Sequence, residues 1–189
     1  HGNESTATMA LMDLFNFLLV DDAFNNIRKT IFDNLTIYMI PMLNPDGAEQ
    51  FTRRNAYDID INRDALRLSS PEARILKGAR DSLQPEYGFN LHDQNRYTSV
   101  GISGKTATIS FLAPAFDWDK SVNDVRRRSL QLIVTLNNML QQYLPGQVAK
   151  YDDTFEPRAF GDNIQKWGTS TILIECGGQP GDLEKQLIR

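Results

Sequence analysis

The sequence predicts an α/β fold in which helices cover both faces of a sheet. Short apolar runs rich in β-branched residues alternate along the chain with longer stretches of helical periodicity, and this alternation is typical of α/β domains. The 189 residues, 41% of them hydrophobic, are enough for one domain with a sizeable core. In such sheets, functional sites collect at the carboxyl ends of the strands.

The first third of the chain predicts two helices and a strand. Ser5 or Thr6 can cap a helix over residues 5–20, whose apolar positions wrap most of its surface. A second, short helix is expected over residues 23–32. The apolar, β-branched run 35–42 predicts a buried strand that ends near its proline.

The remaining elements follow a long irregular stretch, residues 44–70. Ser70 followed by Pro71 predicts the start of a helix that runs to about Leu83, since proline is favoured in the first turn. The other expected elements are strands at 87–92, 106–112 and 170–175 and a long amphipathic helix at 120–143.

Composition argues against several classes of function. A net charge of −4 gives no sign of binding to nucleic acids or anionic membranes. The basic run 126–128 is expected to be a solvated helix face. No apolar stretch reaches the ~20 residues that a membrane-spanning helix needs. Cys176 stands alone, which excludes an intrachain disulfide and a zinc site built on cysteines.

The first four residues offer a metal site. His1 and Glu4 lie three positions apart where a helix is about to begin, so both side chains can reach one ion. Imidazole nitrogen and carboxylate oxygen are good zinc ligands, and a catalytic zinc ion typically takes three protein ligands and a water molecule. His92, after a strand-like run, is the candidate third ligand.

The irregular stretch 44–70 is long for a compact domain, which favours a functional loop. Arg53 and Arg63 could clamp a carboxylate or stabilise an oxyanion, and Asn62 could share the carboxylate with Arg63. Asp60 could accept the second N–H of a metal-bound histidine. Taken singly, each arginine also fits a surface ion pair, and Asp60 an ordinary loop acid.

Glu175 ends the apolar run 171–174 and is the candidate proton acceptor. Burying a carboxylate at a strand end is unfavourable unless it has a partner or a function. Beside a metal-bound water it could take a proton and later return it to the leaving amine. The alternative is a strand-end acid paired with a nearby arginine.

With these residues in place, the chain resembles the M14 zinc carboxypeptidases, the metallocarboxypeptidase A-like group. Five motifs match in the family's order over residues 1–175, which is far more specific than a lone HxxE. They are His1-Gly2-Asn3-Glu4, Asn44-Pro45-Asp46-Gly47, Arg53 with Asp60-Ile61-Asn62-Arg63, Asn90-Leu91-His92-Asp93-Gln94, and Ile172-Leu173-Ile174-Glu175.

The resemblance implies a mixed, mostly parallel twisted sheet and a role for each matched residue. His1, Glu4 and His92 would bind one Zn²⁺, and Asp60 would orient His1. Arg53 would polarise the scissile carbonyl, and Glu175 would be the general base and then the general acid. Asn62 and Arg63 would hold the terminal carboxylate of a peptide substrate. The resemblance also favours a periplasmic or secreted location, and it says nothing of oligomeric state.

Three features fit the family pattern less closely. Members carry a mobile tyrosine upstream of the base, and Tyr151 lies 24 residues before Glu175 in surroundings that match no motif. The specificity pocket would lie near residues 160–163, where Asp162 could favour a basic side chain. We expect residues 1–189 to form a single catalytic domain that lacks the family's N-terminal strands and C-terminal helix.

Two other functions share some of these residues. An aspartoacylase-like zinc amidohydrolase, which deacylates N-acyl amino acids, also has HGxE and an Asn-Arg pair. The Asn-Pro-Asp-Gly segment and the positions of Arg53 and Glu175 fit the peptidase better. A non-catalytic peptide-binding module on the same fold would be expected to lack Glu175 or one of the ligands, and this chain retains them all.

Overall fold

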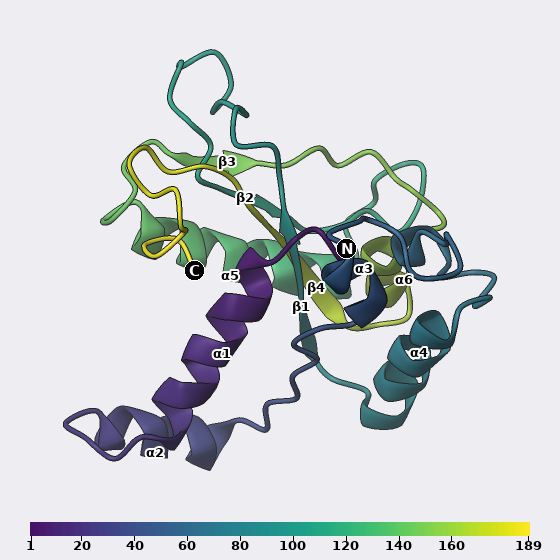
Figure 1. Ribbon diagram of the computed structural model, residues 1–189, viewed down its shortest axis with the longest axis horizontal. Helices are drawn as coiled ribbons and strands as arrows, with labels where there is room; N and C mark the ends of the chain where they lie inside the picture. The colour runs from purple at the N-terminus through teal and green to yellow at the C-terminus, as the bar shows by residue number, and fades with distance from the viewer.

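The computed structural model describes residues 1–189 and is built on a four-stranded sheet in the order β1-β4-β2-β3 (Figure 1). The strands are β1 (Tyr87–Asp93), β2 (Ile109–Leu112), β3 (Val148–Lys150) and β4 (Ser170–Cys176). β1 pairs with β4 in parallel, as β2 does with β3, and the central pair of β2 and β4 is antiparallel. The predicted mixed, mostly parallel sheet is therefore confirmed.

Helices cover both faces of this sheet. Asn90 and Leu173 are paired in register, so their side chains share one face, and Gly161 at the start of α6 (Phe160–Lys166) approaches Asn90 on that face. Ser170 lies three positions from Leu173 and therefore points to the opposite face. There it accepts a hydrogen bond from Arg128 of α5 (Asp124–Leu140).

The two N-terminal helices form an arm that extends away from the sheet (Figure 1). They are α1 (Thr6–Leu19) and α2 (Asn25–Asn34), close to the predicted ranges. Ser5 occupies the cap position of α1, but its side chain makes no capping bond. Instead, the buried Thr6 donates its hydroxyl to Asp93 Oδ2 at 2.7 Å, which ties the start of α1 to the end of β1.

The predicted buried strand over residues 35–42 is wrong. The segment forms no ladder with any of the four strands, and its large apolar side chains are exposed, as at Leu35 and Tyr38. An apolar, β-branched run becomes a buried strand only where a neighbouring strand and a covering layer meet it. In this chain the segment instead links α2 to the loop that follows.

Residues 44–70 contain more regular structure than expected. They include α3 (Pro45–Glu49) and a 3₁₀ turn, η1 (Ile61–Arg63), and they lead into α4 (Pro71–Leu83). Asn44 caps α3 by accepting a hydrogen bond from the Gly47 N–H, and Ser70 caps α4 in the same way. These caps fix the path of a segment that has no sheet to support it.

The basic run 126–128 is only partly solvated, contrary to the prediction. Arg126 is buried and donates hydrogen bonds to the carbonyls of Ala113, Lys120 and Ser121, so it closes the loop that precedes α5. Only Arg127 has the expected exposed position. Separately, no helix of this fold combines the length and the apolarity that crossing a bilayer requires.

A small apolar core joins η1, α4 and α6. Its buried members are Ile61, Ala65, Ala73 and Phe160. The Phe160 ring also meets Trp167 edge-on, with ring centroids 6.4 Å apart. This core fixes the loop that carries Asn62 and Arg63 against the start of α6.

We predict that Phe160→Ala lowers the free energy of unfolding by about 3–5 kcal/mol, because a buried ring is lost and a cavity remains. Urea unfolding measures this change. Phe51→Ala is the matched control: Phe51 is 69% exposed, so its truncation should stay within about 0.5 kcal/mol of wild type. Equal losses in the two variants would contradict this core.

Candidate active site

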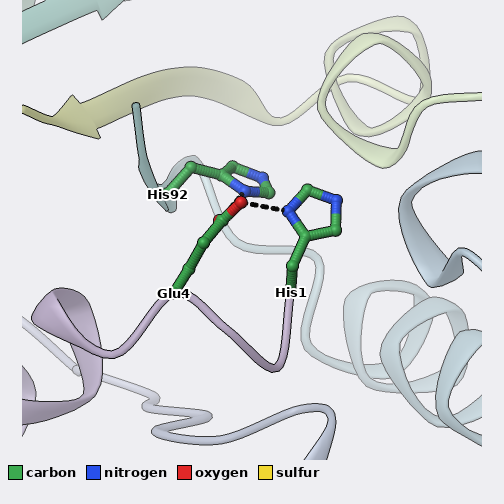
Figure 2. A group of neighbouring side chains, drawn as sticks. All are labelled: His1, Glu4 and His92. Atoms are coloured by element: carbon green, nitrogen blue, oxygen red, sulfur yellow. Dashed lines mark hydrogen bonds and ion pairs between the residues drawn. The ribbon is translucent and has the colours of Figure 1, made fainter. Parts of the chain in front are cut away.

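The three candidate metal ligands meet in space (Figure 2). Glu4 lies between two imidazoles: its Oε1 is 2.5 Å from His1 Nδ1, and its Oε2 is 2.7 Å from His92 Nδ1. One ligand atom from each of the three residues lies within 4.8 Å of the others. The structure therefore brings together residues that are up to 91 positions apart in the sequence.

Local backbone geometry positions the N-terminal pair. The Glu4 N–H donates to the carbonyl of His1 at 3.2 Å, which makes a turn immediately before α1. Gly2 passes so close to α3 that an added Cβ would lie 2.1 Å from the carbonyl carbon of Gly47. Only glycine fits there, so the Asn44–Gly47 turn holds the segment that carries His1.

The donor set and its surroundings fit a zinc ion. Two imidazole nitrogens and one carboxylate oxygen are the ligand types of catalytic zinc sites. Although burial opposes its ionisation, the pKa of Glu4 lies below the ordinary value, because His92 supplies a hydrogen bond and a nearby charge. Glu4 is therefore held as a carboxylate, which is the form that binds a cation.

Asp60 lies on the far side of His1. Its Oδ1 is 3.6 Å from His1 Nε2, and both atoms are buried without a hydrogen-bond partner. A small rotation would join them, which is the carboxylate–histidine arrangement that orients metal ligands. The other Asp60 oxygen accepts from Arg53 Nε at 2.8 Å, and Arg53 Nη1 lies 3.5 Å from His1 Nδ1. Asp60 thus holds Arg53 at the edge of the ligand group.

Glu175 lies beside the ligand group. It is the in-register partner of His92 on the adjacent strand, so both side chains are on the same face of the sheet. Burial raises the pKa of Glu175 to about 8, the charges of Glu4 and Asp93 add to this effect, and Arg53 opposes it. A carboxyl group in this condition can exchange a proton near neutral pH.

Tyr151 follows β3 and lies near the same group. Burial raises the pKa of its phenol, and the charges of Glu175 and Glu4 raise it further. The phenol therefore lies within electrostatic reach of both acids. Its backbone N–H donates to the carbonyl of Phe111 on β2 at 2.9 Å, which fixes the point where the chain leaves the sheet.

Asn62 and Arg63 lie on η1, and each has side-chain N–H groups that make no hydrogen bond within the protein. The Asn62 side-chain carbonyl accepts from the Phe160 N–H at 2.9 Å, which leaves its amide nitrogen unused. Arg63 Nη1 donates to the backbone carbonyl of Asn62 at 2.7 Å, and its Nε lies 3.3 Å from Glu156 Oε2. Arg63 Nη2 makes no hydrogen bond. These free N–H groups can bind a planar anion.

Two acids complete this part of the site. Asp162 accepts from the Glu156 N–H at 3.1 Å, and burial raises the pKa of Asp162 to about 6, with the charge of Glu156 adding to the effect and that of Arg63 opposing it. Asp162 was expected near a pocket from the resemblance. Glu156 was missed, because a single loop glutamate between Phe155 and Pro157 matches no local pattern.

The chain is similar to known carboxypeptidases. The family model for zinc carboxypeptidases, Peptidase_M14, matches residues 1–98. Carboxypeptidase 2 of Trichophyton tonsurans is 26% identical over 124 residues, which is 65% of this chain and 22% of that protein. Carboxypeptidase SOL1 of Arabidopsis thaliana is 33% identical over 86 residues, 40% of this chain and 18% of that protein. The chain thus spans about a fifth of the length of these relatives.

Solved structures show the same fold. A metallo-carboxypeptidase from Burkholderia cenocepacia superimposes with a TM-score of 0.70 at 16% identity, covering 94% of this chain and 46% of the other. At this level of identity the likeness concerns the fold alone. It places the mixed sheet and its flanking helices among the metallocarboxypeptidases.

The raised pKa of Asp162 predicts a pH-dependent stability. The folded state binds a proton at Asp162 more tightly than the unfolded state, so stability falls as the pH rises from about 4 through 6. Asp162→Asn keeps the acceptor for the Glu156 N–H and removes this loss. Between pH 4.5 and pH 7.5, the free energy of unfolding of the variant should rise relative to that of wild type by about 1–2 kcal/mol, a value discounted for solvent screening. Urea unfolding at both pH values measures this gain, and an equal difference at both would contradict the prediction.

Proposed function

Since this chain belongs to the zinc carboxypeptidase family, we propose that it carries the metal and substrate sites of a metallocarboxypeptidase, which removes the C-terminal residue of a peptide. The observation that supports this most is the convergence of His1 Nδ1 and His92 Nδ1 on the Glu4 carboxylate. Two histidines and an acid from distant segments meet at the carboxyl end of β1, which is where catalytic groups gather in such sheets.

His1, Glu4 and His92 are the proposed ligands of one zinc ion. When bound, zinc supplies Lewis acidity, which lowers the pKa of water and polarises a carbonyl group. Asp60 is proposed to fix the ring of His1 through Nε2, since its unpaired Oδ1 lies 3.6 Å from that atom. A single contact between Asp60 Oδ1 and His1 Nε2 would give both of these buried atoms a hydrogen-bond partner.

Glu175 is the proposed general base and then general acid. Its position beside His92 allows it to accept a proton from water and return it to the nitrogen of the leaving residue. Arg53 is proposed to stabilise the negative charge that develops on the scissile carbonyl oxygen. Its contact with Asp60 holds the guanidinium close to His1, at the edge of the ligand group.

Asn62, Arg63 and Tyr151 are the proposed substrate-binding residues. The unused donors of Asn62 and Arg63 would hold the terminal carboxylate, and the Tyr151 phenol, whose pKa is raised by burial and by the charges of Glu175 and Glu4, would contact the substrate. A carboxylate site explains exopeptidase selectivity. An internal peptide bond presents no anion there, so Arg63 would stay unpaired with substrate.

Peptide hydrolysis is preferred over deacylation of N-acyl amino acids, because the similar proteins are named carboxypeptidases. The proposed substrate is a peptide with a free terminal carboxylate, and the family resemblance favours a periplasmic or secreted location. Release of C-terminal residues from peptides, compared with deacylation of N-acyl amino acids, distinguishes the two activities.

Zinc should stabilise the protein through its three ligands. We predict that added zinc raises the melting temperature and that a chelator reverses the gain, because a ligand that binds only the folded state shifts the equilibrium toward that state. His92→Ala should lose this response. Cys176→Ser is the control and should keep it, since the thiol is not among the three grouped ligands. A full zinc response in His92→Ala would reject the site.

Glu175→Gln should keep zinc binding and lose turnover. We expect kcat to fall by at least ~10²-fold, in line with the loss of a general acid–base group. The measurement is release of the C-terminal residue from a peptide, with the zinc content determined on the same sample. Glu86→Gln is the same substitution at an exposed position beyond the opposite end of β1, and its kcat should stay at the wild-type level. Near-normal turnover in Glu175→Gln would exclude the proposed role.

A further inference from the structure

Glu156 is held firmly in place by Arg158. Arg158 Nε donates to Oε1 at 2.9 Å, Nη2 donates to Oε2 at 2.8 Å, and the Arg158 backbone N–H donates to Oε1 at 3.1 Å. These contacts lower the pKa of Glu156 to about 2, and the hydrogen bond from the Arg158 side chain has the largest effect. Glu156 is therefore an anion near neutral pH, and its contacts with Arg158 hold it in place.

This fixed anion meets one edge of the Arg63 guanidinium. Glu156 Oε2 is 3.3 Å from Arg63 Nε, and the backbone carbonyl of Asn62 binds Nη1. The guanidinium is thus held on its Nε edge and at one terminal nitrogen, and Nη2 remains free. A substrate carboxylate can therefore approach the guanidinium at Nη2, whose N–H groups are free.

The loop that carries Glu156 is tied to the segment that carries Arg63. Phe160 N–H binds the Asn62 side-chain carbonyl at 2.9 Å, and the Ala65 N–H donates to the carbonyl of Arg158 at 3.2 Å. Because both sides of the contact are anchored, the Arg63–Glu156 pair has a defined geometry. Glu156 is shared by two arginines, Arg63 and Arg158.

We propose that Glu156 is a positioning residue that orients Arg63 for the terminal carboxylate of the substrate, an inference that rests on the proposed function. Arg63 has a long, flexible side chain that is only partly buried. Without Glu156 it keeps one contact, to the Asn62 carbonyl, and must be ordered when the ligand binds. Ordering a flexible side chain on binding weakens affinity.

A double-mutant cycle tests this role by binding alone. The variants are Glu156→Gln, which removes the charge and keeps the shape, Arg63→Ala, and the two combined. The probes are N-acetylglycine, which has a free carboxylate, and N-acetylglycinamide, which does not. Dissociation constants come from NMR titrations followed on the backbone amides of residues 61–65. The charge-matched control is Glu86→Gln, because Glu86 is an exposed acid immediately before β1.

We expect Glu156→Gln to weaken binding of the acid about fivefold, the upper range for a partly exposed ion pair, and to leave binding of the amide unchanged. In the Arg63→Ala background the second substitution should change nothing further, because its effect passes through Arg63. Glu86→Gln should bind both probes as wild type does.

Other results would overturn the inference in distinguishable ways. If wild type prefers the acid and Glu156→Gln keeps that preference, even with a lower melting temperature, Glu156 is a structural residue only. If the losses add in the double variant, Glu156 does not act through Arg63. If wild type binds acid and amide equally, the carboxylate site of the proposed function fails as well.

Discussion

The site depends on one partly buried carboxylate that is shared between two imidazoles. Removing an acid from water is unfavourable unless it is paired, so Glu4 fixes His1 and His92 relative to each other. The two histidines come from different parts of the fold, one ahead of α1 and one on β1. The contact of Thr6 with Asp93 reinforces the same junction, two residues beyond Glu4 and one residue beyond His92. The start of α1 and the end of β1 therefore behave as one unit.

The pairing of β1 with β4 adds Glu175, the proposed general base, to this unit. Parallel strands in register place His92 and Glu175 side by side, and alternation sends Ile172 and Ile174 to the opposite face. Ile172 is fully buried there, on the side that α5 covers. One strand thus contributes to the core through one face and to the site through the other. Any shift of register by one residue would remove Glu175 from the site.

The sequence predicted those elements whose signals are local and long enough. The α4 helix was predicted from Ser70 and Pro71, because capping chemistry acts within one turn. β4 was predicted from a continuous β-branched run. β3 and α6 were missed, since three and seven residues are too few to show a period. The run 35–42 was misread because its pattern reports a tendency to be buried, while burial itself depends on neighbours that no local pattern describes.

The same difference between local and long-range signals applies to the residues of the candidate site. His1, Glu4, His92 and Glu175 could be predicted because each belongs to a short motif at the end of an expected element. Glu156 could not, because its contact with Arg63 joins two loops 93 positions apart, and neither loop has a period from which the contact could be inferred. Its proposed role comes from geometry: Arg158 binds the Glu156 carboxylate, this carboxylate contacts Arg63 Nε, and Arg63 Nη2 stays free. A residue that acts through another leaves its signal in the structure and not in the sequence around it.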